Sequence, residues 1–138
     1  MDEYKDGKPV DLEQLLLPHR KALVVAAEKV VREAAGKPPE NSQLNRLISV
    51  CAEATCAEEI VNYLRYQASR GSWSDSAGPV IAQIEPPLQI LVASLRGLGD
   101  DVHDSAKVRA WRLYAVFLVR AFRYAAAIKK GNDRAHTR

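Results

Sequence analysis

Residues 104–131 read DSAKVRAWRLYAVFLVRAFRYAAAIKKG, a run without proline and without glycine before Gly131. At 100° per residue, eight apolar side chains fall on one broad face of a helix. They are Val108, Trp111, Tyr114, Ala115, Leu118, Ala121, Phe122 and Ala125. The stretch therefore predicts a long C-terminal amphipathic helix, and its apolar face requires partner helices.

The same helix carries a row of positive charges. Five cations fall within an arc of about 80° when this stretch is drawn as a helix. They are Arg109, Arg112, Arg120, Arg123 and Lys130. Guanidinium groups at helical spacing can follow the phosphates of a nucleic-acid strand through forked hydrogen bonds. The alternative interpretation is a solvated face whose arginine stems cover apolar surface.

The rest of the chain also has helical periodicity. We expect a short helical turn from Asp11 and then helices over the sequence ranges 18–36, 42–54, 56–70, 80–85 and 88–99. Pro86-Pro87 is expected to interrupt the fourth main helix, between its segments 80–85 and 88–99. No stretch alternates at period two. The sequence therefore predicts an all-α fold, a compact bundle of about five main helices that ends in the long basic helix.

Helix starts can be predicted from capping residues. Asn41 or Ser42 is expected to cap the helix over 42–54. Thr55 and Glu58 have the spacing of a capping box for the next helix. The stretch GSWSDSAG over 71–78 is the clearest loop, and we expect its Trp73 to fold back as a lid on the core. The alternative is an exposed contact for a base or a protein.

A length of 138 residues suits one domain. We expect a flexible N-terminus over 1–10, a single helical domain over 11–131 and a flexible basic tail over 132–138. No apolar run approaches the length that spans a bilayer, and the start has no signal-peptide pattern. We expect a soluble, cytoplasmic protein without a membrane partner, whose cysteines are free thiols.

The net charge of +3 is unevenly distributed. Residues 105–138 carry nine Lys and Arg against one Asp, a net charge of +8. Residues 1–104 carry eleven Lys and Arg against sixteen acids, a net charge of −5. A basic end on an acidic body suits a polyanion, or an assembly in which the basic face of one copy meets the acidic face of another.

Catalytic patterns are not found in the sequence. Four residues of metal-ligand type lie close together, Asp100, Asp101, His103 and Asp104. We expect Asp101 or Asp104 to cap the last helix and the others to favour its positive end, in preference to a metal site. There is no phosphate-binding glycine loop and no nucleophile elbow. We therefore expect no enzyme activity, no cofactor and no metal.

Three stretches carry a resemblance to a known family. They are SQLNRLISV at 42–50, NYLRYQASRG at 62–71 and RLYAVFLVRAFRYAAAIKKG at 112–131. In a short all-α chain with a polar start, they resemble the small helical subunits of type III CRISPR effector complexes, which serve antiviral defence. The resemblance implies subunits that stack head to tail, with basic faces beside the guide–target duplex. It implies RNA-backbone contacts by Arg46, Arg65, Arg70, Arg112, Arg120 and Arg123.

The leading hypothesis is a non-catalytic RNA-binding small subunit of a ribonucleoprotein. Its predicted contacts, from the basic row and the resemblance together, are Arg46, Arg65, Arg70, Arg109, Arg112, Arg120, Arg123 and Lys130. Its partners would be single-stranded RNA or a guide–target duplex and the other subunits, with possible self-association. Tyr66 and Trp73 could add stacking surfaces if exposed. The alternative is a helical protein–protein adaptor or homo-oligomer that docks through the apolar Leu88–Leu98 helix.

Overall fold

The computed structural model describes the backbone of residues 4–5 and 8–136 and the side chains of residues 10–132. Two strands, β1 (Tyr4–Lys5) and β2 (Lys8–Pro9), pair antiparallel ahead of the helices. The helices are α1 (Leu12–Leu16), the 3-10 turn η1 (Leu17–His19), α2 (Arg20–Glu33), α3 (Asn41–Glu53), α4 (Ala57–Ser69), α5 (Ala77–Ser94) and α6 (Asp100–His136). The prediction of an all-α bundle with a long C-terminal helix is confirmed.

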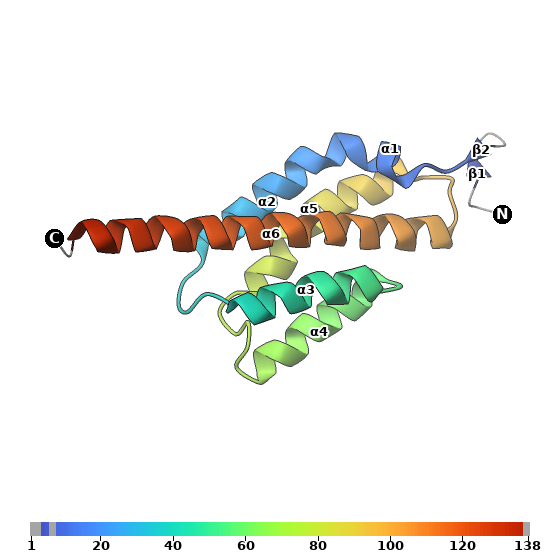
Figure 1. Cartoon of the computed structure of the whole chain (residues 1–138). Helices are drawn as coiled ribbons and strands as arrows, with labels where there is room; N and C mark the ends of the chain where they lie inside the picture. Colours follow the sequence, from blue (N-terminus) through green and yellow to red (C-terminus); the bar gives the residue numbers. More distant parts are fainter. Residues whose placement is uncertain (1–3, 6–7, 137–138) are drawn as a thin grey trace.

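Helix α6 is the axis around which the other helices are arranged (Figure 1). Helices α1 and α2 lie along one side of α6, and α2 makes the most extensive contact with it. Helices α3 and α4 lie side by side on the opposite side, and α5 crosses α6 between these two groups. The broad apolar face of α6 is thus covered from several directions, as its sequence predicts.

The core centres on two aromatic residues of α6. Trp111 and Tyr114 are fully buried and pack edge to face, with ring centroids 5.5 Å apart. The Tyr114 hydroxyl donates to the Val80 carbonyl oxygen of α5 at 2.6 Å. Burial raises the pKa of Tyr114 far above its usual value, so this hydroxyl remains a donor at neutral pH. The bond joins α5 to α6 inside the bundle.

Trp73 is 4% exposed and packs edge-on against Phe122 of α6, with ring centroids 6.3 Å apart. The prediction that it closes the core as a lid is confirmed, and the exposed alternative is wrong. Its backbone has φ 62°, a left-handed conformation that is unusual for a residue with a side chain. Its carbonyl oxygen accepts from the N–H groups of Ser76 and Ala77, which tie the loop to the start of α5.

The predicted interruption at Pro86-Pro87 is wrong, because α5 runs from Ala77 to Ser94 with both prolines inside it. The prolines remove the N–H donors for the carbonyl groups of Ala82 and Gln83. Ala82 is exposed and Gln83 partly exposed, so water can replace the missing donors. The apolar face of α5 stays packed through Ile81, Ile84 and Leu91. Burial of this face holds the helix together across the prolines.

The caps of α3 and α4 differ from the predictions. Glu40, rather than Asn41 or Ser42, occupies the cap position of α3, and its N–H donates to Gln43 Oε1 at 2.8 Å. At α4 the N-cap is Cys56. The N–H of Thr55 donates to Glu59 Oε1 at 3.0 Å, and the Thr55 hydroxyl donates to the same oxygen. The predicted capping box, Thr55 with Glu58, is therefore wrong: the acidic residue that bonds to Thr55 is Glu59.

Both chain ends are more regular than expected. Residues 4–5 and 8–9 form the paired strands within the segment predicted to be flexible. Asp11 then begins α1, because its Oδ1 accepts from the N–H groups of Glu13 and Gln14. At the other end, α6 continues through Gly131 to His136. Residues 1–3, 6–7 and 137–138 of the predicted flexible ends lie outside the described part of the chain.

Candidate nucleic-acid interface

Three of the five cations in the predicted basic row of α6 make contacts within the protein. Arg109 forms an ion pair with Glu13 of α1. Arg112 donates from Nε to the Cys51 carbonyl oxygen and from Nη2 to that of Ala52, each at 2.8 Å. Arg123 donates from Nη2 to Asn45 Oδ1 at 2.8 Å. The interpretation of an open guanidinium row is therefore wrong, because α1 and α3 come close enough to use these donors.

The other two cations of the row are exposed but far from one another. Arg120 borders a hollow between α2 and α6, together with Phe117 and Tyr124. Lys130 lies two turns beyond Phe122, the last buried residue of α6 among the described side chains. The five cations therefore do not form a continuous surface that a phosphate chain could follow.

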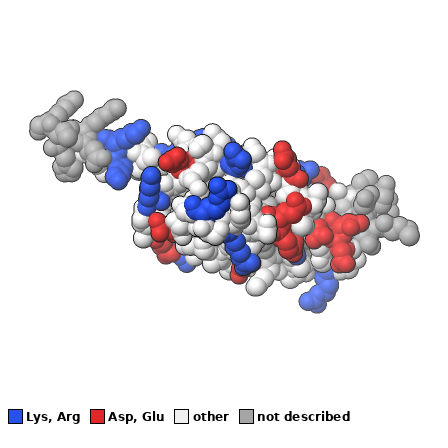
Figure 2. Space-filling view, turned by 90° about the horizontal axis from the view of Figure 1, so that it is seen from below, with Lys and Arg blue, Asp and Glu red and all other residues white. Residues whose placement is uncertain are grey.

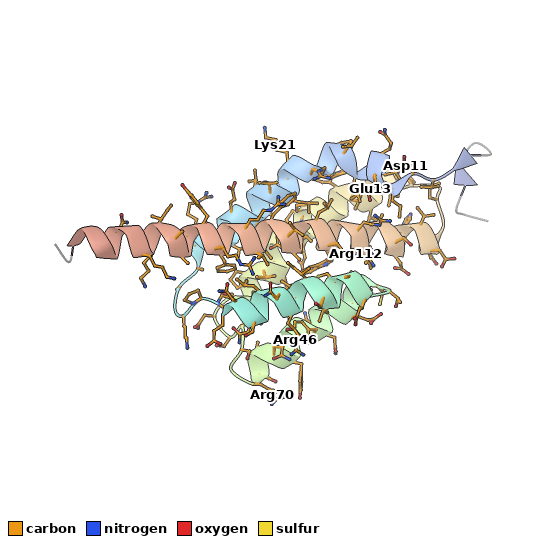
Figure 3. The ribbon with its side chains drawn as sticks, in the orientation of Figure 1. Asp11, Glu13, Lys21, Arg46, Arg70 and Arg112 are labelled. Carbon is orange, nitrogen blue, oxygen red and sulfur yellow. The ribbon has the colours of Figure 1, made fainter. Side chains whose placement is uncertain are left out.

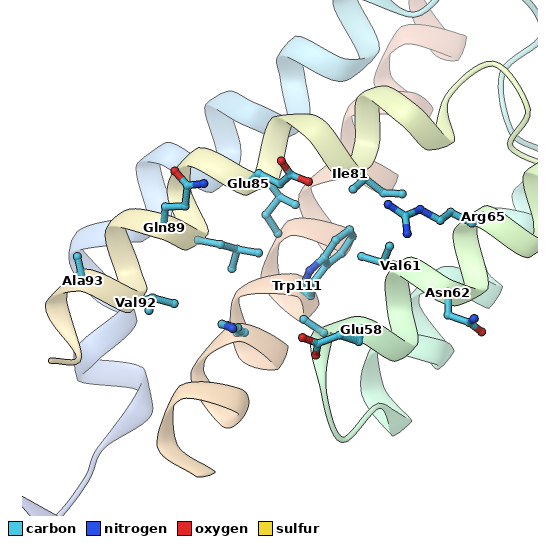
Figure 4. A pocket seen from close by; sticks show the side chains of 14 residues that line it. Glu58, Val61, Asn62, Arg65, Ile81, Glu85, Gln89, Val92, Ala93 and Trp111 are labelled. Carbon is cyan, nitrogen blue, oxygen red and sulfur yellow. The ribbon is translucent and has the colours of Figure 1, made fainter. Parts of the chain in front are cut away.

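Arg65 lies on a different surface. It borders a groove of about 740 Å³ between α4 and α5, whose floor is Trp111 (Figure 4). The walls of this groove are mainly apolar and include Val61, Ile81, Ile84, Leu88 and Val92. Glu58 and Glu85 also line it. Their carboxylates balance the charges of Arg65 and of Lys107, which also lines the groove, so the groove has no net positive charge to attract phosphate.

The structure brings Arg46 and Arg70 together in one polar hollow of about 300 Å³ between α3 and α4. The hollow is lined by Ser42, Gln43, Arg46, Tyr63, Gln67, Arg70 and Ser72. Both arginines lie on the α3–α4 pair, whereas Arg112 lies between α6 and α3 (Figure 3). We call this hollow the α3–α4 hollow. It combines two of the eight predicted contact residues.

Local sequence explains why these side chains converge. Ser42 and Arg46 are four residues apart on α3, and Tyr63, Gln67 and Arg70 follow helical spacing along α4. Because α3 and α4 run antiparallel, the first turn of α3 and the last turn of α4 lie at the same end of the pair (Figure 1). The two polar faces therefore meet at that end.

Arg70 is held at the end of α4 by the geometry of the helix terminus. The N–H of Ser72 donates to the Gln67 carbonyl oxygen at 2.9 Å, and that of Gly71 donates to the Ala68 carbonyl oxygen at 3.1 Å. This is the Schellman arrangement, which requires a left-handed residue after the cap. Gly71 supplies it with φ +88°. The turn directs the chain into the Trp73 loop and leaves Arg70 at the edge of the hollow.

The electrostatics of the α3–α4 hollow favour an anion. Among the described residues that line it, two carry guanidinium groups and none carries a carboxylate. Ser42 and Gln43 belong to the first turn of α3, where the helix dipole is positive. Burial raises the pKa of Tyr63, and the nearby charge of Arg46 acts against that rise. The Tyr63 hydroxyl is therefore a neutral hydrogen-bond donor at pH 7.

A second polar hollow of about 290 Å³ adjoins the first and shares Gln43, Arg70 and Ser72 with it. Acidic residues Glu40 and Asp75 line this neighbour, and Lys37 pairs with Glu40 at 3.7 Å. Positive charge is therefore concentrated in the α3–α4 hollow, where Arg70 and Arg46 lie without a carboxylate. The carboxylates limit it on the other side.

Tyr66 supplies an aromatic surface beside the α3–α4 hollow. Its side chain is 55% exposed. The guanidinium carbon of Arg70 lies 5.6 Å from the centre of its ring, and Nη1 donates to its hydroxyl oxygen at 3.2 Å. This pairing places a planar cation and an exposed ring side by side, an arrangement on which a nucleobase can stack. Trp73, buried in the core, offers no such surface.

Sequence reasoning missed five residues of the hollow, Ser42, Gln43, Tyr63, Gln67 and Ser72. Their helical spacing with Arg46 and Arg70 was available as a signal. The spacing could not show that α3 and α4 pair antiparallel, and it is this pairing that brings their polar faces together. The predicted contacts Arg109, Arg112 and Arg123 serve instead to join α6 to α1 and α3.

The charges on the face seen from below are also polarised (Figure 2). Acidic side chains gather toward the end at which α6 begins, and basic side chains lie mainly in the middle and toward the opposite end. This agrees with the α3–α4 pair, whose connected end carries Glu53, Glu58 and Glu59. The α3–α4 hollow lies at the other end of that pair. The distribution of charged side chains on this face therefore favours an anion at the end of the α3–α4 pair that carries the hollow.

The cluster of possible metal ligands lies inside α6, which begins at Asp100, so the predicted cap at Asp101 or Asp104 is wrong. Asp100 and Asp101 lie in the first turn of α6, and His103 Nε2 donates to the Leu95 carbonyl oxygen at 3.0 Å. Across the described residues, no group of three or more His, Cys, Asp and Glu side chains is arranged to hold a metal ion. Within the same part of the chain, every helix is too short or too polar to cross a bilayer.

Comparison of the chain with family models, with curated proteins and with solved structures finds no match. The resemblance to small subunits of type III CRISPR complexes therefore stays a prediction.

Proposed function

We propose that this chain is a non-catalytic RNA-binding protein that holds phosphate groups of single-stranded RNA in the α3–α4 hollow. The observation that carries the proposal is the convergence of Arg46 and Arg70 in one polar hollow beside the exposed ring of Tyr66. Both arginines are among the contacts that the family resemblance implies. The remaining predicted contacts on α6 are not needed for this function.

The mechanism is independent of base sequence. A phosphate between Arg46 and Arg70 receives charge-assisted hydrogen bonds from two guanidinium groups. The hydroxyl groups of Ser42, Ser72 and Tyr63 line the same hollow and can complete its shell. An adjacent base stacks on Tyr66 next to the Arg70 guanidinium. Phosphate binding releases counterions, so affinity falls as salt rises.

The biological setting is part of the same proposal. A small all-helical RNA-binding chain fits the role of a subunit in a ribonucleoprotein complex, of which a CRISPR effector is the example suggested by sequence resemblance. In that setting other subunits would hold the guide–target duplex. The polarised charge of the surface supports contact with such neighbours.

The experiment is a binding titration by fluorescence anisotropy. The probe is a labelled oligouridine of about 16 nucleotides, enough to cover one small domain. The Arg46→Gln/Arg70→Gln variant should bind at least about tenfold more weakly than the natural protein, since it loses two charge-assisted contacts. The control, Arg120→Gln/Lys130→Gln, removes the same charge from exposed residues elsewhere and should change affinity by less than about twofold.

Equal weakening in both variants would mean that net charge, rather than the α3–α4 hollow, controls binding. No binding by the natural protein would reject the proposal outright. The ratio of absorbance at 260 and 280 nm of freshly purified protein provides an independent check, because co-purified nucleic acid raises it. Treatment with ribonuclease should return that ratio to the value expected for protein.

A protein–protein adaptor is the second candidate, and the groove between α4 and α5 favours it. Leu88 and Val92 line this groove, and Ile90 nearby on α5 is 61% exposed. Apolar walls with charged ends suit the apolar face of a partner helix. The adaptor would be favoured if the purified protein retains no RNA and if the Val61→Asp variant, altered in the groove wall, loses a protein partner while remaining folded.

A further inference from the structure

Two hollows of opposite charge meet at Arg70, which lines both of them. The α3–α4 hollow has two guanidinium groups and no carboxylate among the described residues that line it. Its neighbour is lined by the carboxylates of Glu40 and Asp75 and, apart from Arg70, by one cation, Lys37. A negatively charged strand is therefore attracted as far as Arg70 and repelled beyond it.

The carboxylate of Asp75 is placed by a close approach of two loops. Gly36, in the connection between α2 and α3, lies so near to Asp75 that a Cβ atom at Gly36 would collide with its carboxyl group. Gly36 has φ +80°, a left-handed conformation that glycine adopts without steric cost. The connection before α3 and the Trp73 loop thus meet at this carboxylate, and their contact sets a negative charge in the hollow next to Arg70.

The charge of the α3–α4 hollow exceeds that of one internal phosphate of a strand. An internal phosphate is a diester with a single negative charge. A phosphate monoester carries a charge of about −1.5 to −2 at pH 7 and three strong acceptor oxygens. Arg46 and Arg70 therefore match a monoester in charge, whereas a diester would leave one guanidinium group uncompensated. The hydroxyl groups of Ser42, Tyr63 and Ser72 add donors for a third oxygen.

Tyr66 offers a strand a way out of the α3–α4 hollow that avoids the carboxylates. Its ring is 55% exposed and lies against Arg70, and it does not line the neighbouring hollow. A strand whose last phosphate lies between the two arginines needs only this one path, with its first base stacked on Tyr66. A strand that passes through with an internal phosphate needs a second path, and the negatively charged neighbour borders the hollow at Arg70.

We propose that the α3–α4 hollow binds the terminal phosphate of a single-stranded RNA, a monoester, in preference to its internal phosphates. This inference rests on the proposed function and adds which part of the strand is held. Arg46 and Arg70 compensate the charge of the monoester, and Glu40 and Asp75 disfavour a further nucleotide beyond it. A 5′-phosphate and a 3′-phosphate share this chemistry, so the test compares both.

The test is a titration by fluorescence anisotropy with two pairs of labelled oligouridines. In the first pair, labelled at the 3′ end, one strand has about 8 nucleotides and a 5′-phosphate, and the other is one nucleotide longer with a 5′-hydroxyl group. Both contain the same number of phosphate groups, so a difference in affinity reports the terminal position. The second pair, labelled at the 5′ end, compares a 3′-phosphate with a 3′-hydroxyl group in the same way. The natural protein should bind the phosphorylated strand about tenfold more tightly in one of the pairs.

Arg46→Gln/Arg70→Gln should bind the two strands of each pair equally, with an unchanged helical circular-dichroism spectrum. The control Arg120→Gln/Lys130→Gln removes the same charge elsewhere and should keep the preference of the natural protein. A preference that survives Arg46→Gln/Arg70→Gln would overturn the inference, and so would equal affinities of the natural protein within both pairs. If those equal affinities still fall in Arg46→Gln/Arg70→Gln, the proposed RNA site stands without a terminal preference. Failure to bind any of the four strands would reject the proposed function itself.

Discussion

Arg112 of α6 is bonded to the last turn of α3: its Nε donates to the Cys51 carbonyl oxygen at 2.8 Å. Nη2 of the same side chain donates to the Ala52 carbonyl oxygen at 2.8 Å. Carbonyl groups in the last turn of a helix lack intrahelical donors, and a cation there also complements the helix dipole. This arginine of the basic row therefore has a structural role, joining α6 to α3.

Arg112→Met should destabilise the fold while leaving RNA binding intact. The substitution keeps an apolar stem but removes both donors, and hydrogen bonds to charged groups contribute about 1.5–3 kcal/mol. Urea denaturation followed by circular dichroism measures the loss. Arg109→Met is the matched control, because its exposed ion pair with Glu13 should contribute less than about 1 kcal/mol. Equal losses in the two variants would contradict the structural role of Arg112.

Glu59 should stabilise the start of α4 in a pH-dependent way. Hydrogen bonds from the Thr55 side chain and backbone lower the pKa of Glu59 from its usual value of 4.5. A lowered pKa means that the ionised group stabilises the fold above pH 4.5, and that this contribution is lost as the pH falls through the folded-state pKa. Glu59→Ala should therefore lower the Tm at pH 7, and its difference from the natural protein should shrink below pH 4.5.

Glu58→Ala is the control for this measurement, since Glu58 lies in the same first turn of α4 and is also exposed. Both substitutions remove one favourable charge from the positive end of the helix dipole. Thermal melts at several pH values should show the larger effect for Glu59→Ala. A larger effect for Glu58→Ala would instead support the capping box predicted from the sequence.

The two cysteines should react at very different rates. Burial raises the pKa of the Cys51 thiol to about 12, and the nearby charge of Arg112 only partly opposes the rise. Since the thiolate is the nucleophile, Cys51 should resist iodoacetamide at pH 8 in the native protein. Cys56 is partly exposed and should be labelled first. Peptide mass spectrometry resolves the two sites, and rapid labelling of Cys51 without denaturant would contradict its burial.

The fold was largely readable from the sequence because its strongest signals are local. The uninterrupted apolar face around Trp111 and Tyr114 predicted α6 correctly, and Trp73 was expected to close the core. Pro86 and Pro87 led to a wrong prediction of a helix break. The free-energy cost of a proline inside a helix depends on whether the carbonyl groups that lose their N–H donors can bond to water, and the sequence does not show which of them face solvent. Capping depended on which side chain, Glu58 or Glu59, could reach Thr55.

The candidate site was less predictable for a related reason. A helical projection places Arg112 and Arg123 in one row, but it cannot show that α3 lies close enough to accept their hydrogen bonds. Arg46 and Arg70 were identified as separate residues, and the antiparallel pairing of α3 with α4 brings them together. Tertiary contacts therefore decided both which arginines are used internally and which two share a hollow.

The most direct test of the account is the salt dependence of RNA affinity. A plot of the logarithm of affinity against the logarithm of salt concentration has a slope of about −0.7 for each phosphate contacted on a single strand. Arg46→Gln/Arg70→Gln should make that slope shallower by about 0.7, because the two arginines share one phosphate. Arg120→Gln/Lys130→Gln should leave it unchanged. A slope that is the same in the natural protein and in Arg46→Gln/Arg70→Gln would show that RNA does not bind in the α3–α4 hollow.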